Sequence, residues 1–173
     1  MQYGGRKINR FTTAVVVVAF AGFLMAQSPQ PATPPAANVN QLMQALFFPN
    51  SNVVFSTQRQ DPAAVQRADE PSAATDPLKS VFGGWGAVEN SALTLIDGAD
   101  LLMTPGRTCS NGRAAPVTAP DWVKLVDQLR EAGKVAYAAA KSKNIDKMFE
   151  ASDVLNTACS DCHNKYRRAN RCQ

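Results

Sequence analysis

Near the end of the chain, two cysteines and the only histidine of the 173 residues stand in the order Cys159, Cys162, His163. This C-x-x-C-H run is the attachment site of c-type haem, in which both thiols add to the vinyl groups as thioethers and the adjacent imidazole binds iron. Zinc sites more often combine several histidines or cysteines. The motif therefore predicts one covalently attached haem c, anchored by Cys159 and Cys162, with His163 as an axial iron ligand.

The N-terminus has the layout of an export signal. Basic residues at positions 6, 7 and 10 precede an apolar run over residues 11–25, and Ala26 follows it. The run is shorter than the roughly 20 residues of a bilayer span. Residues 1–26 are therefore predicted to be a cleaved signal peptide, with an uncleaved membrane anchor as the alternative. The predicted location is the periplasm, without stable membrane insertion of the mature chain.

Export also bears on the motif and on the charge. An exported compartment oxidises thiols, so an unmodified C-x-x-C pair would tend to form a disulfide, whereas c-type haem is attached after export. Loss of the signal lowers the number of Lys and Arg residues from 18 to 15, against 14 Asp and Glu residues. The mature chain is thus almost neutral, and no basic patch indicates a nucleic acid partner.

The remaining sequence predicts a Pro-rich linker over residues 27–37 and one domain over residues 38–173. Helical apolar spacing occupies about residues 39–57, 85–103, 119–143 and 145–168, and residues 58–84 form a long connection. Pro49 is expected to kink or split the first helix. No segment alternates as a strand would, so the fold class is an all-α, antiparallel four-helix bundle with covalent haem on the C-terminal helix.

The helix termini and the last helix carry further expectations. Asn144 is expected to cap the last helix, and Thr118 with Asp121 the third. The inner face of the last helix is predicted to comprise Ile145, Met148, Phe149, Ser152, Leu155, Cys159, Cys162, His163 and Tyr166.

Antiparallel order places the start of helix one at the same end of the bundle as the haem motif. Met43 is therefore the leading candidate for a sixth iron ligand, and the alternative is that it only packs in the core. Met103 is a weaker candidate at a helix terminus, and Met148 is about three turns from the motif. Phe47 and Trp122 could flank the haem plane, or be ordinary core aromatics.

The same order brings Cys109, between helices two and three, close to Cys172, just after helix four. A disulfide is favoured in an oxidising compartment, and two free thiols or intermolecular pairing are the alternatives. A four-sulfur zinc site with the motif cysteines is a further reading. Arg107 is the preferred candidate to contact a haem propionate, and the other basic candidates are Lys165, Arg167, Arg168 and Arg171.

The stretch over residues 158–167, ACSDCHNKYR, in a four-helix chain resembles the C-terminal helix of the cytochrome c prime family, the class II c-type cytochromes. The resemblance covers the layout of the mature domain, and its specific motif about ten residues. Low-spin members carry a helix-one methionine on iron, which Met43 matches in placement, whereas high-spin members leave that position open. Pro49, the long connection and the Cys109 and Cys172 pair depart from the most compact members. Pairing of helices one and two into a homodimer is common in the family and is one expectation here.

Two functions follow from these expectations. The first is a periplasmic monohaem electron carrier with His163 and Met43 as axial ligands, which exchanges electrons with redox partner proteins and is not an enzyme. The alternative is a five-coordinate, high-spin haem protein that binds nitric oxide or carbon monoxide. No second histidine or distal acid-base pair supports haem catalysis, so no catalytic residue is predicted.

Overall fold

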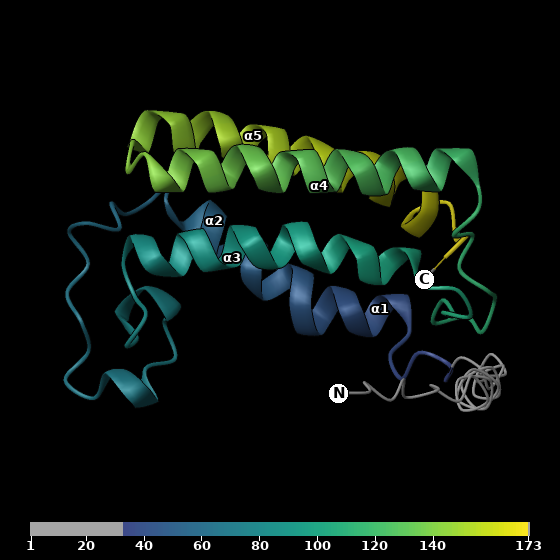
Figure 1. Ribbon diagram of the computed structural model, residues 1–173, viewed down its shortest axis with the longest axis horizontal. Helices are drawn as coiled ribbons and strands as arrows, with labels where there is room; N and C mark the ends of the chain where they lie inside the picture. The colour runs from purple at the N-terminus through teal and green to yellow at the C-terminus, as the bar shows by residue number, and fades with distance from the viewer. Residues whose placement is uncertain (1–32, 173) are drawn as a thin grey trace, which may run out of the picture. The chain divides into compact units, whose positions relative to one another are not determined.

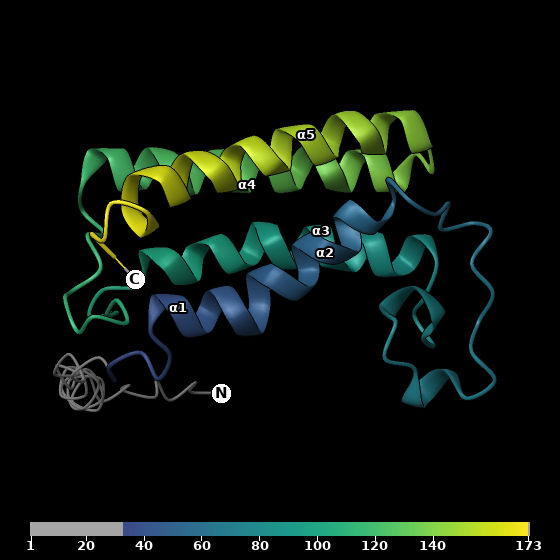
Figure 2. The same ribbon diagram turned by 180° about the vertical axis from the view of Figure 1, so that it is seen from behind.

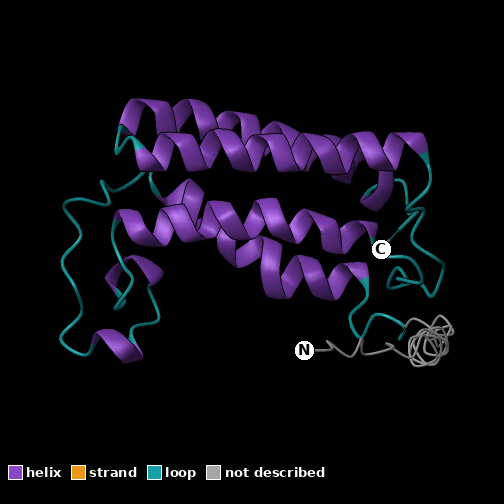
Figure 3. Cartoon of the chain, viewed as in Figure 1, coloured by secondary structure: helices purple, strands orange, loops and turns teal. Residues whose placement is uncertain are grey.

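The computed structural model describes residues 33–172. The predicted signal peptide, residues 1–26, and the first part of the predicted linker lie outside this range. The compact unit begins at Pro34, so the last residues of the predicted 27–37 linker belong to it. Within the described range the regular structure is helical, and extended pairing is limited to a bridge between Thr108 and Ala114 (Figure 3).

Four helical segments form a bundle, as the apolar spacing predicted. The first comprises α1 (Val39–Leu42), a π-helical turn (Met43–Phe47) and α2 (Phe48–Ser56), and the second comprises α3 (Trp85–Gly98) and a 3-10 helix (Ala99–Met103). The third is α4 (Pro120–Lys141), and the fourth is α5 (Ile145–Cys162) with a second π-helical turn (His163–Arg167). Successive segments run in opposite directions, and α4 lies beside α5 in both views (Figures 1 and 2).

The first segment stays continuous through Pro49, which was expected to kink or split it. Asn38 and Gln41 start it with a capping box, in which each side chain accepts the other residue's backbone N–H. Pro49 has no N–H to donate to the preceding turn. The turn before it widens instead, and the N–H of Phe48 donates to the carbonyl of Met43, five residues back. A π turn therefore takes the place of a break.

One predicted helix cap is confirmed and one is wrong. Asn144 caps α5, because its side chain accepts the N–H of Lys147 at 2.9 Å. At the start of α4 the cap residue is Ala119 instead of Thr118, and it makes no side-chain hydrogen bond. The carboxylate of Asp121 accepts the N–H of Trp122 at 3.0 Å. Pro120 at the first helical position leaves one donor fewer to satisfy there, which lowers the need for a cap side chain.

The core follows the predicted helix faces with one clear exception. Phe149 was expected on the inner face of the last helix, but its side chain is 44% exposed. Met148, directly before it, is fully buried together with Leu155. Neighbouring residues on a helix point about 100° apart, and here Met148 points into the core while Phe149 lies at the solvent side. Two alanines, Ala151 and Ala158, occupy the space beside that seam.

Helices α3 and α4 approach closely where the sequence is poor in large side chains. Gly133 of α4 is buried against Ile96 of α3, and a Cβ added at Gly133 would lie 2.8 Å from Ile96 Cγ1 and 3.3 Å from the Ile96 backbone nitrogen. The side chain of Ile96 can shift, but the backbone nitrogen is fixed by its helix. A glycine therefore allows this crossing to be closer than a larger residue would.

Gly133→Ala is expected to lower the free energy of unfolding by about 1 kcal/mol. Overpacking of a tight contact costs about 1–3 kcal/mol, and the better helix propensity of alanine returns up to about 1 kcal/mol. Gly86→Ala in α3 is the control, since a Cβ there meets nothing within 4 Å, and this variant should unfold at an equal or higher denaturant concentration. Equal stabilisation of both variants in chemical denaturation would contradict the close crossing.

Within residues 33–172 there is no helix with the length and apolar character needed to cross a membrane.

Candidate functional site

A cavity of about 250 Å³ opens at the end of the bundle where α1 begins and the last helical segment ends. It brings together three of the residues that the sequence singled out, Met43, Cys162 and His163. The rest of its wall is formed by Val39, Asn40, Leu102, Ser110, Trp122, Tyr166, Arg167 and Cys172. Antiparallel order had predicted that helix one and the haem motif share one end, and the cavity lies at that end.

The motif cysteines lie on one face of α5. Cys159 and Cys162 are free thiols, half-buried, and three residues apart on the helix. Burial raises the pKa of Cys159. Burial, with a smaller contribution from neighbouring Cys159, raises the pKa of Cys162 to about 11. Both sulfurs are therefore protonated near neutral pH in the folded chain and are not bonded to each other.

His163 follows Cys162 and begins the second π-helical turn, where its carbonyl accepts the N–H of Arg168 at 2.8 Å. Burial lowers the pKa of its imidazole, and the charges of Arg167 and Arg168 lower it further. The neutral imidazole is the form that binds a metal ion. The surroundings of His163 therefore favour its ligand form.

Met43 is the methionine that faces the same cavity as His163. It is partly buried against the core and begins the first π-helical turn. Met103 and Phe47 do not line the cavity. Met148 is buried near the start of α5, at the opposite end of that helix from His163. Both candidate iron ligands thus stand at the first residue of a π turn, a feature that is rare in helices and frequent at functional sites.

Two aromatic side chains form one wall of the cavity. The rings of Trp122 and Tyr166 meet edge to face, with their centroids 4.8 Å apart and an interplanar angle of 84°. The indole N–H of Trp122 donates to the carbonyl of Leu102 at 3.2 Å. The pair holds the start of α4 against the last π turn. The sequence left open whether Trp122 flanks a haem or packs in the core, and the structure places it both in the core and in the cavity wall. The partnership with Tyr166 was missed.

A polar network fixes the other side of Tyr166. Asp121 pairs with Lys165 at 2.6 Å and hydrogen bonds with the phenol of Tyr166. The hydrogen bond from Lys165, followed by that from Tyr166, lowers the pKa of Asp121 to about 2. Burial, followed by the hydrogen bond to Asp121, raises the pKa of Tyr166 to about 12. The phenol is therefore held in its neutral, donating form.

Tyr166 is expected to make stability fall as the pH rises from about 10 to about 12. In that range the folded state keeps the phenol proton that the unfolded state, with an ordinary tyrosine pKa near 10, releases. Its contribution is complete below pH 10 and is lost as the pH passes the folded pKa. Urea unfolding at stepped pH should show a steeper decline for the native chain than for Tyr166→Phe. Parallel declines in the two proteins would contradict the raised pKa of Tyr166.

Arg107 does not reach the cavity, although it was the preferred candidate for a propionate. The residue is buried, its Nε donates to the carbonyl of Leu101 at 2.6 Å, and its Nη1 donates to the carbonyl of Ala37. Burial also lowers its pKa. Arg107 thus ties the start of the first helical segment to the end of the second. Of the basic residues considered, Arg167 lines the cavity.

Cys109 and Cys172 form a disulfide, with their Cα atoms 5.0 Å apart. The sequence favoured this pairing over free or intermolecular thiols. The bond joins the loop before α4 to the C-terminal tail, and Cys172 forms part of the cavity wall. The four-sulfur zinc reading is therefore wrong, since two of its sulfurs are bonded to each other. Among residues 33–172 no cluster of three or more His, Cys, Asp or Glu side chains could hold a metal ion.

The residues at this cavity fit a covalent haem. The thiol of Cys162, the imidazole of His163 and the thioether of Met43 line it, between aliphatic and aromatic walls. The second free thiol, Cys159, lies one helical turn before Cys162 and is not part of the cavity wall. Arg167 supplies a cation for a carboxylate. At about 250 Å³ the cavity is slightly below the roughly 300 Å³ at which ordinary ligand pockets begin. Its walls would therefore have to part to admit a macrocycle.

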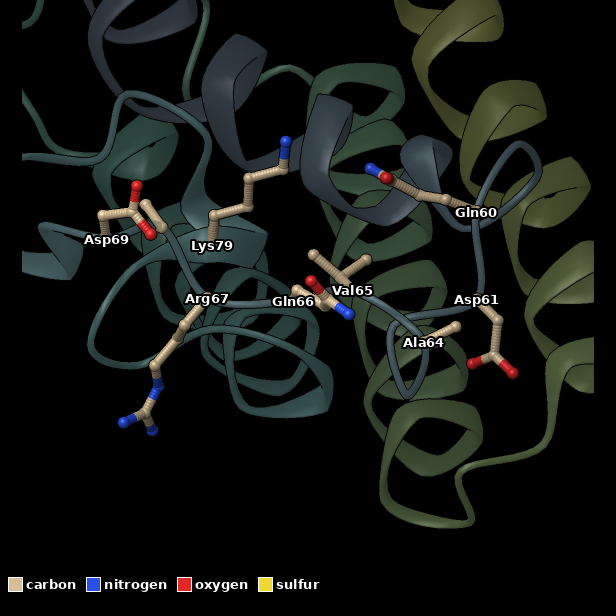
Figure 4. Close-up of a pocket in the computed structure, with 9 residues that line it drawn as sticks. Gln60, Asp61, Ala64, Val65, Gln66, Arg67, Asp69 and Lys79 are labelled. Atoms are coloured by element: carbon tan, nitrogen blue, oxygen red, sulfur yellow. The ribbon is translucent and has the colours of Figure 1, made fainter.

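A larger hollow of about 690 Å³ lies along the 58–84 connection, remote from the motif. Figure 4 shows that the charged ends of Arg67 and Lys79 point in opposite directions, and that Asp61 and Asp69 lie at opposite ends of the hollow. Polar groups that bind a small molecule converge on it. The charged groups of this hollow do not converge on a common point, so the smaller cavity beside His163 is the candidate site.

Comparison with protein-family models, curated proteins and solved structures finds no match to this chain.

Proposed function

We propose that this protein is a periplasmic c-type cytochrome that carries electrons through one covalently attached haem, with His163 and Met43 as axial ligands. The observation that carries the proposal is that Met43, 120 positions before His163 in the sequence, lines the same cavity as Cys162 and His163. A thioether and an imidazole on opposite sides of the iron give a six-coordinate centre suited to electron transfer.

The bound haem would supply the one-electron chemistry, and the chain would attach and shield it. Cys159 and Cys162 would form the two thioethers, and His163 would bind the iron through its neutral imidazole. Trp122 and Tyr166 would cover the macrocycle and exclude water. Solvent exclusion and hydrogen bonding around a metal centre both set its redox potential. Arg167 would balance a propionate charge.

The resemblance to the cytochrome c prime family supports the same assignment, since the ACSDCHNKYR stretch and the four-helix order occur together in this chain. The export signal over residues 1–26 would deliver the chain to the compartment where haem is attached. Electron transfer needs a redox partner and no catalytic residue, so the proposed role is that of a carrier.

The absorption spectrum of the reduced protein, produced with haem-attachment machinery, tests the proposal. Sharp and separate visible bands that carbon monoxide leaves unchanged are expected from a closed, six-coordinate iron. A broad visible band that shifts with the gas would replace the electron carrier by the gas-binding alternative. An absence of haem absorption would overturn both.

The reduced native protein is expected not to bind carbon monoxide, whereas reduced Met43→Ala is expected to bind it fully. Removal of the thioether leaves the sixth position open, so the visible bands should broaden and shift on addition of the gas. Met103→Ala is the matched control, because Met103 is partly buried but does not line the cavity. If both variants keep the native spectrum under carbon monoxide, Met43 packs without binding iron.

A further inference from the structure

The seam between α4 and α5 forms a groove of about 770 Å³ on a face of α5 that the haem cavity does not use. The cavity beside His163 is lined from the last helical segment by Cys162, His163, Tyr166 and Arg167. The groove is lined from the same segment by Asp153, Val154, Thr157, Ala158 and Asp161. The two hollows have no lining residue in common.

The floor of the groove is apolar and partly open to solvent. Ala132 and Ala158 are buried beneath it, whereas Val135 and Val154 are 43% and 44% exposed. On α4 the lining runs from Pro120 to Val135, which spans about four turns, and on α5 from Asp153 to Asp161, about two turns. A long apolar groove parallel to two helices is the shape that accepts an amphipathic helix.

The rim of the groove is acidic. Four carboxylates line it, from Asp127, Glu131, Asp153 and Asp161, against the single ammonium of Lys124. Asp127 and Glu131 pair with Arg130 and Lys134 of their own helix, at 2.5 and 2.7 Å. Asp153 and Asp161 make no ion pair with any residue in the range 33–172. Their charges face solvent beside the exposed valines and are available to a partner.

We propose that this groove docks an amphipathic helix of a partner protein whose apolar face is flanked by Lys or Arg. The apolar side chains of that helix would cover Val135 and Val154, and its cations would meet Asp153 and Asp161. A two-fold contact with a second copy of this chain would set like charges against each other. An anionic membrane surface would be repelled for the same reason.

The groove lies close to the proposed haem site, so a helix docked in it could serve electron transfer. This consequence rests on the proposed function. Asp161 lies inside the C-x-x-C-H run, so one end of the groove reaches the back of the haem-bearing turn. A helix docked there would approach the cofactor through one layer of helix. Binding itself does not depend on the cofactor, and it can be measured whether or not haem absorption is present.

The test is a titration of the full processed protein, isotopically labelled, with a synthetic Leu/Lys amphipathic helix followed by amide chemical shifts. Shifts confined to the facing sides of α4 and α5 are expected. Val154→Asp should weaken binding about tenfold, the equivalent of one lost apolar contact. Val81→Asp in the connection, at a similarly exposed residue, should leave affinity unchanged.

The variant Val154→Asp distinguishes docking of an apolar face from simple charge attraction. If the peptide is held only by negative charge, Val154→Asp will bind it equally well or more tightly, and the proposal fails. Asp153→Asn with Asp161→Asn should weaken binding, whereas the exposed pair Asp69→Asn with Asp97→Asn, with the same loss of charge, should not. Equal weakening by both pairs, or a dimer in sedimentation that Val154→Asp dissociates, would also overturn it.

Discussion

A variant with serine at both Cys159 and Cys162 is expected to carry no covalently bound haem. A serine hydroxyl does not replace the thiol in addition to a vinyl group, so both thioethers are lost. On a denaturing gel stained for haem the native chain should give a signal at its own mass, and this variant none. Each single variant keeps one thiol and should retain a weaker signal.

The second pair of cysteines provides the control for the first. The variant with serine at Cys109 and Cys172 has lost the same number of sulfurs, but these are the bonded ones. It should stain for haem like the native chain. Equal staining of the two double variants, or staining of neither, would contradict the assignment of the C-x-x-C-H run as the attachment site.

The same control variant is expected to lose about 4 kcal/mol of stability. The disulfide spans 63 residues, and in the chain-entropy model a crosslink of this length removes about 4 kcal/mol of freedom from the unfolded state. Chemical denaturation of the native and variant proteins in the same state of haem loading measures the difference. Reductant should lower the midpoint for the native chain and leave that of the variant in place.

A loss below about 1 kcal/mol would mean that the unfolded chain stays compact without the crosslink. Because Cys172 also forms part of the cavity wall, carbon monoxide binding by the variant should be recorded alongside. A gain of binding would show that the tail closes the site as well as stabilising the fold.

The helical framework was accessible from sequence because it rests on local rules. Apolar spacing of 3.6 residues marks the buried stripes of α3, α4 and α5, and Asn144 caps through a contact with its own chain three residues on. Phe149 was misplaced because a bulky apolar side chain next to Met148 looks buried in the pattern. The apolar pattern does not say where the edge of the buried stripe falls, and in the structure Met148 lies inside that edge and Phe149 outside it.

The site was accessible only in part. The order of the helices placed Met43 with His163 and brought Cys109 close to Cys172. The role of Arg107 was not accessible, since a guanidinium can donate to backbone carbonyls as well as to carboxylates, and only the fold brings Ala37 within its reach. The contact of Asp121 with Lys165 and Tyr166 joins the start of one helix to the end of another. No local pattern records such a contact.

The two π turns have a consequence for how the chain can vary in length. A π turn holds about one residue more than an α turn over the same rise, so the segments that start at Met43 and at His163 each contain a residue that a regular helix would not need. Loss of one residue there would restore α geometry while the helix on either side keeps its facing direction, whereas a deletion in a regular α-helix rotates everything on one side by about 100°. The two π turns are therefore the places in these helices where the chain can shorten by one residue and keep its packed faces, and such a deletion acts on the cavity through Met43 or His163 in the turn itself.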